Sequence, residues 1–217
     1  MTTVPRVALV HALAHSIAPV NAEFARQWPG CELMNLLDDS LSADLAAGRA
    51  RLDEATTQRF LDLTAYALGT GARGVLFTCS AFGPCLEAVQ RRWPEVPILK
   101  PNEAMIADAV QRGTRIGLVA TFTGTLGSMP AEFPQSLTVV PILVEGALAA
   151  LNEGNGATHD RLVAAAARKA VHAGCDVVAL AQFSLARAAS AVAEATRLPV
   201  LTTVESAVRL LRERVEG

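Results

Sequence analysis

The sequence predicts an α/β fold of two pseudo-symmetric, duplicated halves, each with a central parallel sheet flanked by helices, and an active site in the cleft between them. Residues 71–79 (GARGVLFTC) align without a gap on residues 174–182 (GCDVVALAQ). In each copy a proline and two apolar residues come shortly after this block, and a glutamate follows them. Such internal similarity is typical of a repeated supersecondary unit. Short apolar runs that alternate with longer alanine-rich stretches point to the same fold class.

Short runs rich in β-branched residues and leucine predict buried parallel strands. We expect these strands at residues 7–10, 74–78, 98–99, 116–120, 139–144, 177–181 and 200–201. Longer stretches with apolar residues at helical spacing predict the intervening helices. We expect these helices at residues 52–68, 84–92, 103–111, 159–173, 186–197 and 204–215. Strands that alternate with helices in this way give Rossmann-like halves, in which right-handed crossovers connect parallel strands.

The repeat sets the boundary between the two halves. We expect the first half to cover residues 1–101 and the second half to cover residues 102–203. The C-terminal helix at 204–217 is expected to pack back on the first half and to complete it. Residues 127–135 and 152–156 are rich in proline or glycine, so we expect loops there.

Composition limits the partners of this chain. Its 217 residues are 51% hydrophobic and carry a formal net charge of −2, without a run of like charges. Nucleic acid and anionic membranes are bound by clustered Lys and Arg, so neither is expected as a partner. No apolar stretch approaches the roughly 20 residues that span a bilayer. A small carboxylic acid is the expected ligand, and a homodimer is an oligomeric state that so apolar a chain allows.

The four cysteines show no CxxC motif and no zinc-type spacing. A chain of this size does not need disulfides, so we expect reduced thiols, a cytoplasmic location and no metal. The sequence also has no GxGxxG motif and no phosphate-binding P-loop. No cofactor is therefore expected.

Polar and small residues follow the carboxyl ends of the predicted strands, where ligands bind to open parallel sheets. Hydroxyl groups and the free N–H groups of helix N-termini donate hydrogen bonds to small anions. The sequence therefore predicts a carboxylate site at these strand ends. The residues expected to bind the substrate are Ser80, Thr121, Thr125, Gln182 and Ser184.

Cys79 is the predicted catalytic residue. It ends one predicted strand and precedes a helix, a position where the helix dipole lowers the pKa of a thiol and raises its reactivity. The alternative is a buried structural cysteine, but the strand end and the hydroxyl neighbours favour catalysis. Cys31, Cys85 and Cys175 lack this setting, and we expect them to be structural.

The four histidines divide into two pairs. His11 follows the first strand, so it is either a core residue with satisfied hydrogen bonds or a ligand-binding, proton-carrying residue. His15 is a weaker candidate for the second role. His159 and His172 lie on a predicted helix far from any strand end, and we expect them on its solvated face.

Two glutamates occupy equivalent positions in the repeat. Glu103 and Glu205 follow Asn102 and Thr203, which are suited to cap a helix N-terminus. We therefore expect each glutamate in the first turn of a helix, where it faces the positive end of the helix dipole. An acid–base pair is the alternative interpretation.

These motifs together resemble the aspartate/glutamate/hydantoin racemase superfamily, which has arylmalonate decarboxylase and maleate isomerase relatives. The resemblance rests on Cys79-Ser80, on the blocks at 116–125 and 176–182, and on Leu198-Pro199-Val200-Leu201. It implies two α/β halves and cofactor-free chemistry, with two cysteines, one from each half, on opposite sides of a carbon next to a carboxylate.

Gln182 stands where the resemblance places the second cysteine. Because glutamine does not exchange a proton at a useful pKa, the chain departs from the two-thiol pattern. The resemblance then implies an isomerase- or racemase-like enzyme in which Cys79 is the thiolate base or nucleophile, and His11 or Ser184 the second proton carrier. The alternatives are a lyase that decarboxylates a substituted malonate with a single thiol, and a carboxylate-binding protein without catalysis.

Overall fold

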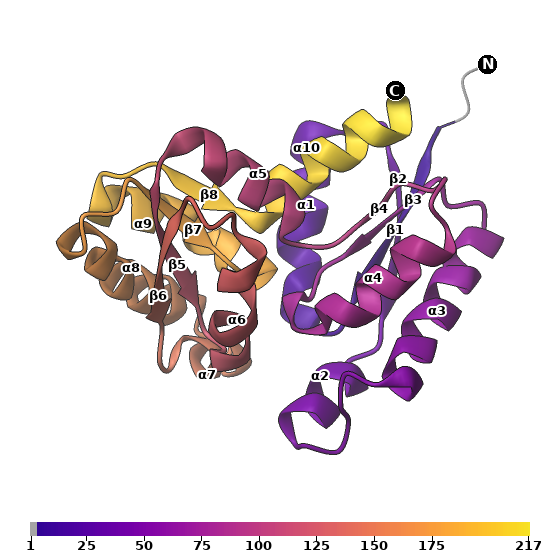
Figure 1. The fold of residues 1–217 in the computed structure, drawn as a ribbon, viewed down its shortest axis with the longest axis horizontal. Coiled ribbons are helices and arrows are strands. Elements are labelled where there is room, and N and C mark those ends of the chain that lie inside the picture. Colours follow the sequence, from indigo (N-terminus) through magenta and orange to yellow (C-terminus); the bar gives the residue numbers. More distant parts are fainter. Residues whose placement is uncertain (1–3) are drawn as a thin grey trace. The chain divides into compact units, whose positions relative to one another are not determined.

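The computed structural model describes residues 4–217 as two compact units (Figure 1). The first unit runs up to Pro101 and includes Ala207–Gly217, and the second unit is Asn102–Ser206. Each unit has its own parallel sheet and its own buried hydrophobic clusters. The predicted α/β class with two similar halves is confirmed. The predicted cleft between the halves concerns their mutual arrangement and stays a prediction.

The first unit alternates strands and helices. Its strands are β1 (Arg6–His11), β2 (Glu32–Leu37), β3 (Gly74–Phe77) and β4 (Ile98–Leu99). Its helices are α1 (Ile17–Gln27), α2 (Ser40–Ala46), α3 (Glu54–Gly69) and α4 (Gly83–Arg92). Short 3-10 turns are η1 (Ala14–Ser16) and η2 (Ser80–Phe82). Helix α10 (Thr203–Glu216) begins in the second unit and contributes its residues from Ala207 to the first.

The second unit repeats this alternation. Its strands are β5 (Arg115–Ala120), β6 (Thr138–Leu143), β7 (Val177–Leu180) and β8 (Val200–Thr202). Its helices are α5 (Glu103–Arg112), α6 (Thr123–Ser128), α7 (Ala147–Asn152), α8 (Gly156–His172) and α9 (Ala189–Thr196). The 3-10 turns are η3 (Met129–Glu132) and η4 (Phe183–Ala188).

The two sheets have the same topology. Their strand orders are β2-β1-β3-β4 and β6-β5-β7-β8, with all neighbours parallel. In the first sheet Val7 pairs with Gly74, and in the second sheet Ile116 pairs with Val177. The order reverses direction between the first and third strands of each unit. Such a switch point is where the carboxyl ends of strands leave room for a ligand.

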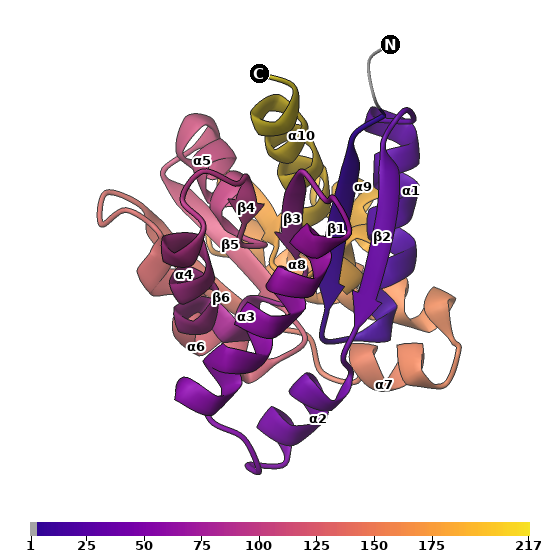
Figure 2. The ribbon, with the colours of Figure 1, turned by 90° about the vertical axis from the view of Figure 1, so that its right-hand side faces the viewer.

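In the first unit, helices cover both faces of the sheet (Figure 2). The face with Val75 and Phe77 packs against α3 and α4, and the Phe60 ring lies 5.6 Å from that of Phe77. The other face meets α10, because a Cβ atom at Gly74 would lie 2.8 Å from the Val215 side chain. Glycine therefore lets this helix approach the strand closely.

In the second unit, α8 and α9 cover one face of the sheet, and α5 and η3 cover the other. Gly117 permits the close approach of α8, since a Cβ atom there would lie only 2.6 Å from the Cβ of Ala170. Met129 and Phe133 are buried on the opposite face. The segment at 127–135 was expected to be a loop, but part of it forms the helical turn η3, because Met129 and Phe133 pack into the core.

Several elements have no clear signal in the sequence. Strand β2 begins with the polar residue Glu32 and contains Asn35, so it lacks a continuous apolar run. It is an edge strand, and some of its positions are exposed. Helices α1, α2, α6 and α7 are likewise absent from the sequence-based expectations. The helix expected at 186–197 is divided into the turn η4 and helix α9.

The helix caps at the repeated glutamates differ from expectation. Glu103 and Glu205 do lie in the first turns of α5 and α10. However, Asn102 makes no side-chain cap bond, and Thr203 is already the first residue of α10. The cap bond comes from Thr202, whose Oγ1 accepts the N–H of Glu205 at 3.1 Å. Asn102 therefore holds the predicted N-cap position of α5 without a bond from its side chain, and the assignment of Thr203 as an N-cap was wrong.

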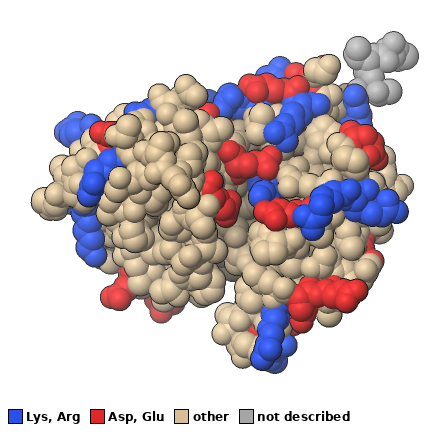
Figure 3. Space-filling model, in the orientation of Figure 1, with Lys and Arg blue, Asp and Glu red and all other residues tan. Residues whose placement is uncertain are grey.

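Charged residues of both signs lie next to one another on the face shown in Figure 3. Within residues 4–217, no helix combines the length and the apolar character needed to cross a lipid bilayer.

Candidate functional site

Cys79 occupies the predicted position at the carboxyl end of β3. Its backbone is extended, with φ −121° and ψ 118°, and the turn η2 and helix α4 follow directly. The side chain is half-buried. Two nearby donors, the Ala81 N–H and the Ser42 hydroxyl, act to lower the pKa of this thiol.

The expected lowering of the Cys79 pKa is wrong. Burial raises the pKa of the thiol, and the hydrogen bonds from Ala81 and Ser42 offset only part of this effect. The low-dielectric surroundings penalise the thiolate more than the neighbouring donors stabilise it. Sequence position alone indicates the dipole but does not reveal this desolvation.

His11 is fully buried at the end of β1. Its Nδ1 lies 2.9 Å from Thr78 Oγ1, and its Nε2 lies 3.0 Å from Asn35 Oδ1. Because the amide oxygen of Asn35 only accepts, Nε2 carries the proton, and Nδ1 accepts the hydroxyl hydrogen of Thr78. Burial lowers the pKa of His11, so its ring is neutral at pH 7.

This network connects three neighbouring strands. His11 ends β1, Thr78 directly precedes Cys79, and Asn35 lies on the edge strand β2. Both ring nitrogens are engaged, so His11 must break a hydrogen bond before it can move a proton. The contacts match those of a core histidine that fixes the strand ends beside Cys79.

In the second unit, Gln182 and Thr121 are directly bonded. Gln182 Oε1 lies 2.6 Å from the Thr121 backbone nitrogen and 2.9 Å from its Oγ1. A backbone N–H only donates, so the side-chain atom that faces it must be the amide oxygen. The Thr121 hydroxyl must then donate to the same oxygen. This anchoring directs the two Nε2–H donors away from Thr121.

The other predicted binding residues lie near their respective strand ends. Ser80 begins η2 immediately after Cys79. Thr125 is buried in α6, and its N–H donates to the Phe122 carbonyl at 3.2 Å. Ser184 is buried in η4, two residues beyond Gln182. The structure therefore groups Cys79, His11 and Ser80 in the first unit, and Thr121, Gln182, Thr125 and Ser184 in the second.

His159 is fully buried, which contradicts its expected place on a solvated helix face. Its Nδ1 lies 2.7 Å from Asp160 Oδ1, and Arg187 of η4 donates to the same carboxylate at 2.8 Å. Burial opposes ionisation of Asp160, but the bonds from Arg187 and His159 hold the pKa of this carboxyl below its usual range. The packing of α8 against α7 and η4 accounts for the difference, because it covers the first turn of α8. His172 is exposed, as expected.

The remaining cysteines have structural surroundings. Cys85 is buried in α4, and Cys175 is buried just before β7. Cys31 lies at the start of β2, with its Sγ 3.5 Å from the Pro5 carbonyl oxygen. Burial raises the pKa of Cys31 to about 12, so it is a thiol at neutral pH.

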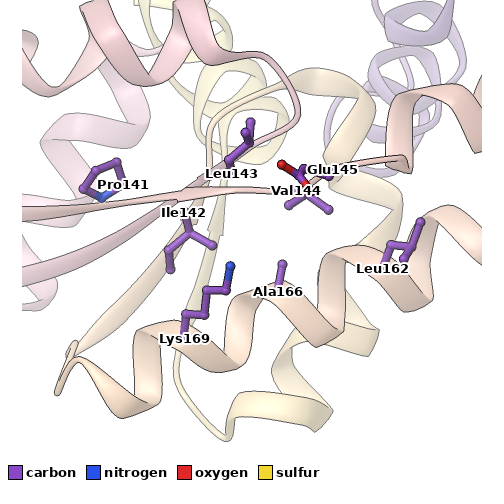
Figure 4. Close-up of a pocket in the computed structure, with 8 residues that line it drawn as sticks. All are labelled: Pro141, Ile142, Leu143, Val144, Glu145, Leu162, Ala166 and Lys169. Atoms are coloured by element: carbon purple, nitrogen blue, oxygen red, sulfur yellow. The ribbon is translucent and has the colours of Figure 1, made fainter.

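A separate pocket of about 330 Å³ lies beside the edge strand β6 (Figure 4). Its lining comes from β6 and the residues after it, and from Leu162, Ala166 and Lys169 of α8. None of the predicted site residues lines this pocket.

The sequence analysis missed Asn35 and Ser42, which contact His11 and Cys79. Both lie in or just after β2. The only sequence signal of Asn35 is its place after the apolar pair Leu33-Met34, which becomes meaningful once β2 is recognised as a neighbour of β1. Ser42 has no such signal.

Two duplicated α/β units with polar side chains at the strand switch points define an open-sheet α/β protein of the class that binds ligands at its strand ends. The description "Asp/Glu/Hydantoin racemase" belongs to a family model that matches residues 18–211. The chain belongs to this family, which makes it an enzyme of the racemase and isomerase type. No curated protein sequence matches the chain.

Solved structures share the fold over nearly the whole chain. Allantoin racemase from Klebsiella pneumoniae is 20% identical with a TM-score of 0.75, over 98% of this chain and 88% of that chain. Glutamate racemase RacE1 from Bacillus anthracis is 13% identical with a TM-score of 0.76, over 98% and 82%. Picrophilus torridus aspartate racemase is 9% identical with a TM-score of 0.72, over 98% and 94%. At these identities the similarity concerns the fold.

Proposed function

We propose that the chain is a cofactor-independent isomerase or racemase-like enzyme, in which Cys79 acts at the carbon next to the carboxylate of a small acid. Cys79 is the thiolate base in proton transfer, or the nucleophile that adds to this carbon. The support is its place at a strand end, where the Ala81 N–H and the Ser42 hydroxyl counteract the rise in the pKa of the thiol that burial causes. Both groups donate to the thiolate, the form that reacts.

The proposed carboxylate site consists of hydrogen-bond donors at the strand ends. Ser80, Thr125 and Ser184 contribute hydroxyl groups, and the free N–H groups of the following turns add further donors. Thr121 donates both its hydrogens to Gln182 and therefore acts through that side chain. Gln182 presents its amide N–H groups to the substrate. These donors also stabilise the enediolate that forms when the proton leaves the carbon.

The asymmetry between Cys79 and Gln182 carries this proposal. The two residues are equivalent in the duplicated sequence, yet one has a thiol and the other an anchored amide. An amide donor stabilises negative charge but does not take up a proton at neutral pH. The second proton carrier is then Ser184 or His11, and the buried, doubly bonded His11 is the less accessible of the two.

The same asymmetry favours a second candidate, a lyase that decarboxylates a substituted malonate. In that reaction the bond between the carbon and one carboxylate breaks and carbon dioxide leaves. The electron pair of that bond stays on the carbon and is shared with the remaining carboxylate as an enediolate. The Cys79 thiol then gives its proton to this carbon and becomes a thiolate, which solvent protonates again. One thiol is sufficient for this sequence, and the raised pKa of Cys79 suits a proton donor.

Proton NMR in heavy water tests the proposal on small carboxylic acids, including amino acids, aryl-substituted malonates, maleate and hydantoins. We expect the wild type and a Cys31→Ala control to convert or deuterate at least one acid, and Cys79→Ala to lose this activity. Release of carbon dioxide from a malonate would identify the lyase. Full turnover by Cys79→Ala would refute the role of the thiol. Tight carboxylate binding without any proton exchange would identify a binding protein instead.

We propose a cytoplasmic location on the basis of the cysteines, which are all free thiols in the structure. A reducing compartment maintains this state. The expected partners are a small carboxylic acid and, in a homodimer, a second copy of the chain. Fractionation of cells and the mass of the protein in solution test these two points.

A further inference from the structure

The short helix α2 contributes a residue to the surroundings of Cys79. Ser42 lies in the first turn of α2, and its hydroxyl is one of the two donors that lower the pKa of the Cys79 thiol. Leu41, next to it in the chain, is buried in the hydrophobic cluster against which Cys79 packs. A helix of seven residues is not stable by itself in water. The position of Ser42 therefore depends on the tertiary contacts that hold α2.

Arg59 of α3 makes several of these contacts. Its Nη2 lies 2.6 Å from Asp38 Oδ2 and 2.5 Å from Ser40 Oγ, and its Nη1 lies 3.8 Å from Asp44 Oδ2. Ser40 Oγ lies 2.6 Å from the other oxygen of Asp38. One guanidinium thus binds the residues before, at the start of and near the end of α2.

We call the contacts of Arg59 with Asp38, Ser40 and Asp44 the clamp. Its ion pairs are present at neutral pH because its carboxyl groups are ionised there. Burial opposes ionisation of Asp38, but the bonds from Ser40 and Arg59 hold the pKa of its carboxyl below its usual range. The side chains of Arg59 and Asp38 are 35% and 26% exposed, so solvent screens the pair less than a fully exposed one. Leu41, between Ser40 and Ser42, is buried in the core beneath α2. The clamp and the buried leucine together fix the first turn of the helix.

We propose that Arg59 is a positioning residue for Cys79, which holds the first turn of α2 so that the Ser42 hydroxyl donates to the reactive sulfur. The inference deepens the proposed function and rests on it, because a thiolate matters most if Cys79 is the catalytic group. Arg59 does not touch the sulfur. Its effect passes through Ser42, and the two residues are therefore energetically coupled.

The rate of alkylation of Cys79 measures this effect without any substrate. The free energy of a hydrogen bond to a charged group is large enough to change the fraction of Cys79 present as thiolate about tenfold. The nucleophilicity of a thiolate rises with its pKa, which offsets part of the loss. We therefore expect Ser42→Ala to lower the alkylation rate at neutral pH roughly threefold and to move the pH profile upwards.

The experiment follows iodoacetamide labelling of Cys79 in the full chain by peptide mass spectrometry, as a function of pH. Arg59→Met should reproduce the slower labelling of Ser42→Ala, and the double variant should be no slower than either. Arg59→Lys should restore part of the rate, since lysine pairs with Asp38 but lacks the guanidinium fork. The matched control is Arg49→Met, which removes a different cation from Asp44, because Arg49 pairs with that carboxylate and Arg59 binds Asp38 and Ser40. It should label like the wild type.

Different results overturn different parts of the inference. Unchanged labelling in Ser42→Ala would refute the contact with the sulfur. An Arg59→Met effect that persists in the Ser42→Ala background would show that Arg59 acts by its charge and not by positioning. Thermal unfolding shows whether each variant is folded. If Arg59→Met is not, the labelling rate of Arg59→Lys takes its place in the test. Activity in Cys79→Ala would refute the proposed function while leaving these labelling results intact.

Discussion

Gln182 Oε1 accepts two hydrogen bonds from one residue, the backbone N–H and the hydroxyl of Thr121, at 2.6 and 2.9 Å. The bond joins the ends of the neighbouring strands β5 and β7. It also settles the orientation of the amide, because both hydrogens of Thr121 point at the oxygen. The position equivalent to Cys79 thus presents fixed N–H donors to its surroundings.

Gln182→Glu should weaken the binding of a carboxylate substrate by at least about tenfold, because it exchanges a donor for an acceptor and adds a like charge. The new carboxylate still accepts both bonds from Thr121, so we expect little change in thermal stability. Isothermal titration with the acid found active by NMR measures the affinity. The control is Gln135→Glu, the same change at an exposed position. Equal affinities of the two variants would contradict the binding role of Gln182.

Thr121→Val should destabilise the protein by about 1 kcal/mol, since it removes one of the two bonds to Gln182 and leaves the backbone bond in place. The Gln182 amide then loses part of its anchoring, so we expect a higher KM with a smaller change in kcat. Urea unfolding and steady-state kinetics provide the two measurements. Thr123→Val, at an exposed position of α6, is the matched control and should behave like the wild type. A kcat effect alone would argue against a binding role.

The sequence was sufficient to predict the inner strands and the duplicated organisation. The strands β1, β3, β5 and β7 are continuous apolar runs because helices cover both of their faces, and this burial appears directly in composition. The edge strand β2 carries Glu32 and Asn35 and escapes the same criterion. The residues that depend on β2, Asn35 and Ser42, were missed with it.

The side-chain contacts of the site depend on information that is not local. The bond between Gln182 and Thr121 requires two strand ends, 61 residues apart, to lie at the same height in the sheet. The burial of His159 requires α8 to pack against α7 and η4. The pKa of Cys79 depends on the balance of burial against two donors, one of them from α2. None of these relations is visible in residue type or spacing.

Gly117→Ala should destabilise the second unit by about 1–3 kcal/mol, because the added Cβ would lie 2.6 Å from that of Ala170. The double variant Gly117→Ala, Ala170→Gly should recover part of the loss, less the helix cost of about 1 kcal/mol for the new glycine. Thermal unfolding measures both. Gly127→Ala adds the same group where no atom lies within 4 Å and should not destabilise. Without recovery in the double variant, the steric explanation fails.

His11 should make the stability of the protein depend on pH. Burial lowers the pKa of His11 in the folded protein below its usual value of 6.5, and the bond to Asn35 offsets only part of this shift. Between the folded and unfolded pKa values the unfolded chain binds more protons, so the free energy of unfolding rises with pH in this window. The contribution is complete above about pH 6.5 and is lost as the pH falls through the folded pKa.

Replacement of His11 by a residue that does not titrate tests this dependence. In His11→Gln the loss of stability between pH 7.5 and pH 5.5 should be smaller than in the wild type, although the variant is less stable at pH 7.5 because the network with Thr78 and Asn35 is disturbed. Urea unfolding at both pH values gives the two free energies for each protein. The same loss in both proteins would show that His11 keeps its proton equilibrium on folding. In that case burial would not keep the His11 ring neutral, and His11 would return as a candidate proton carrier.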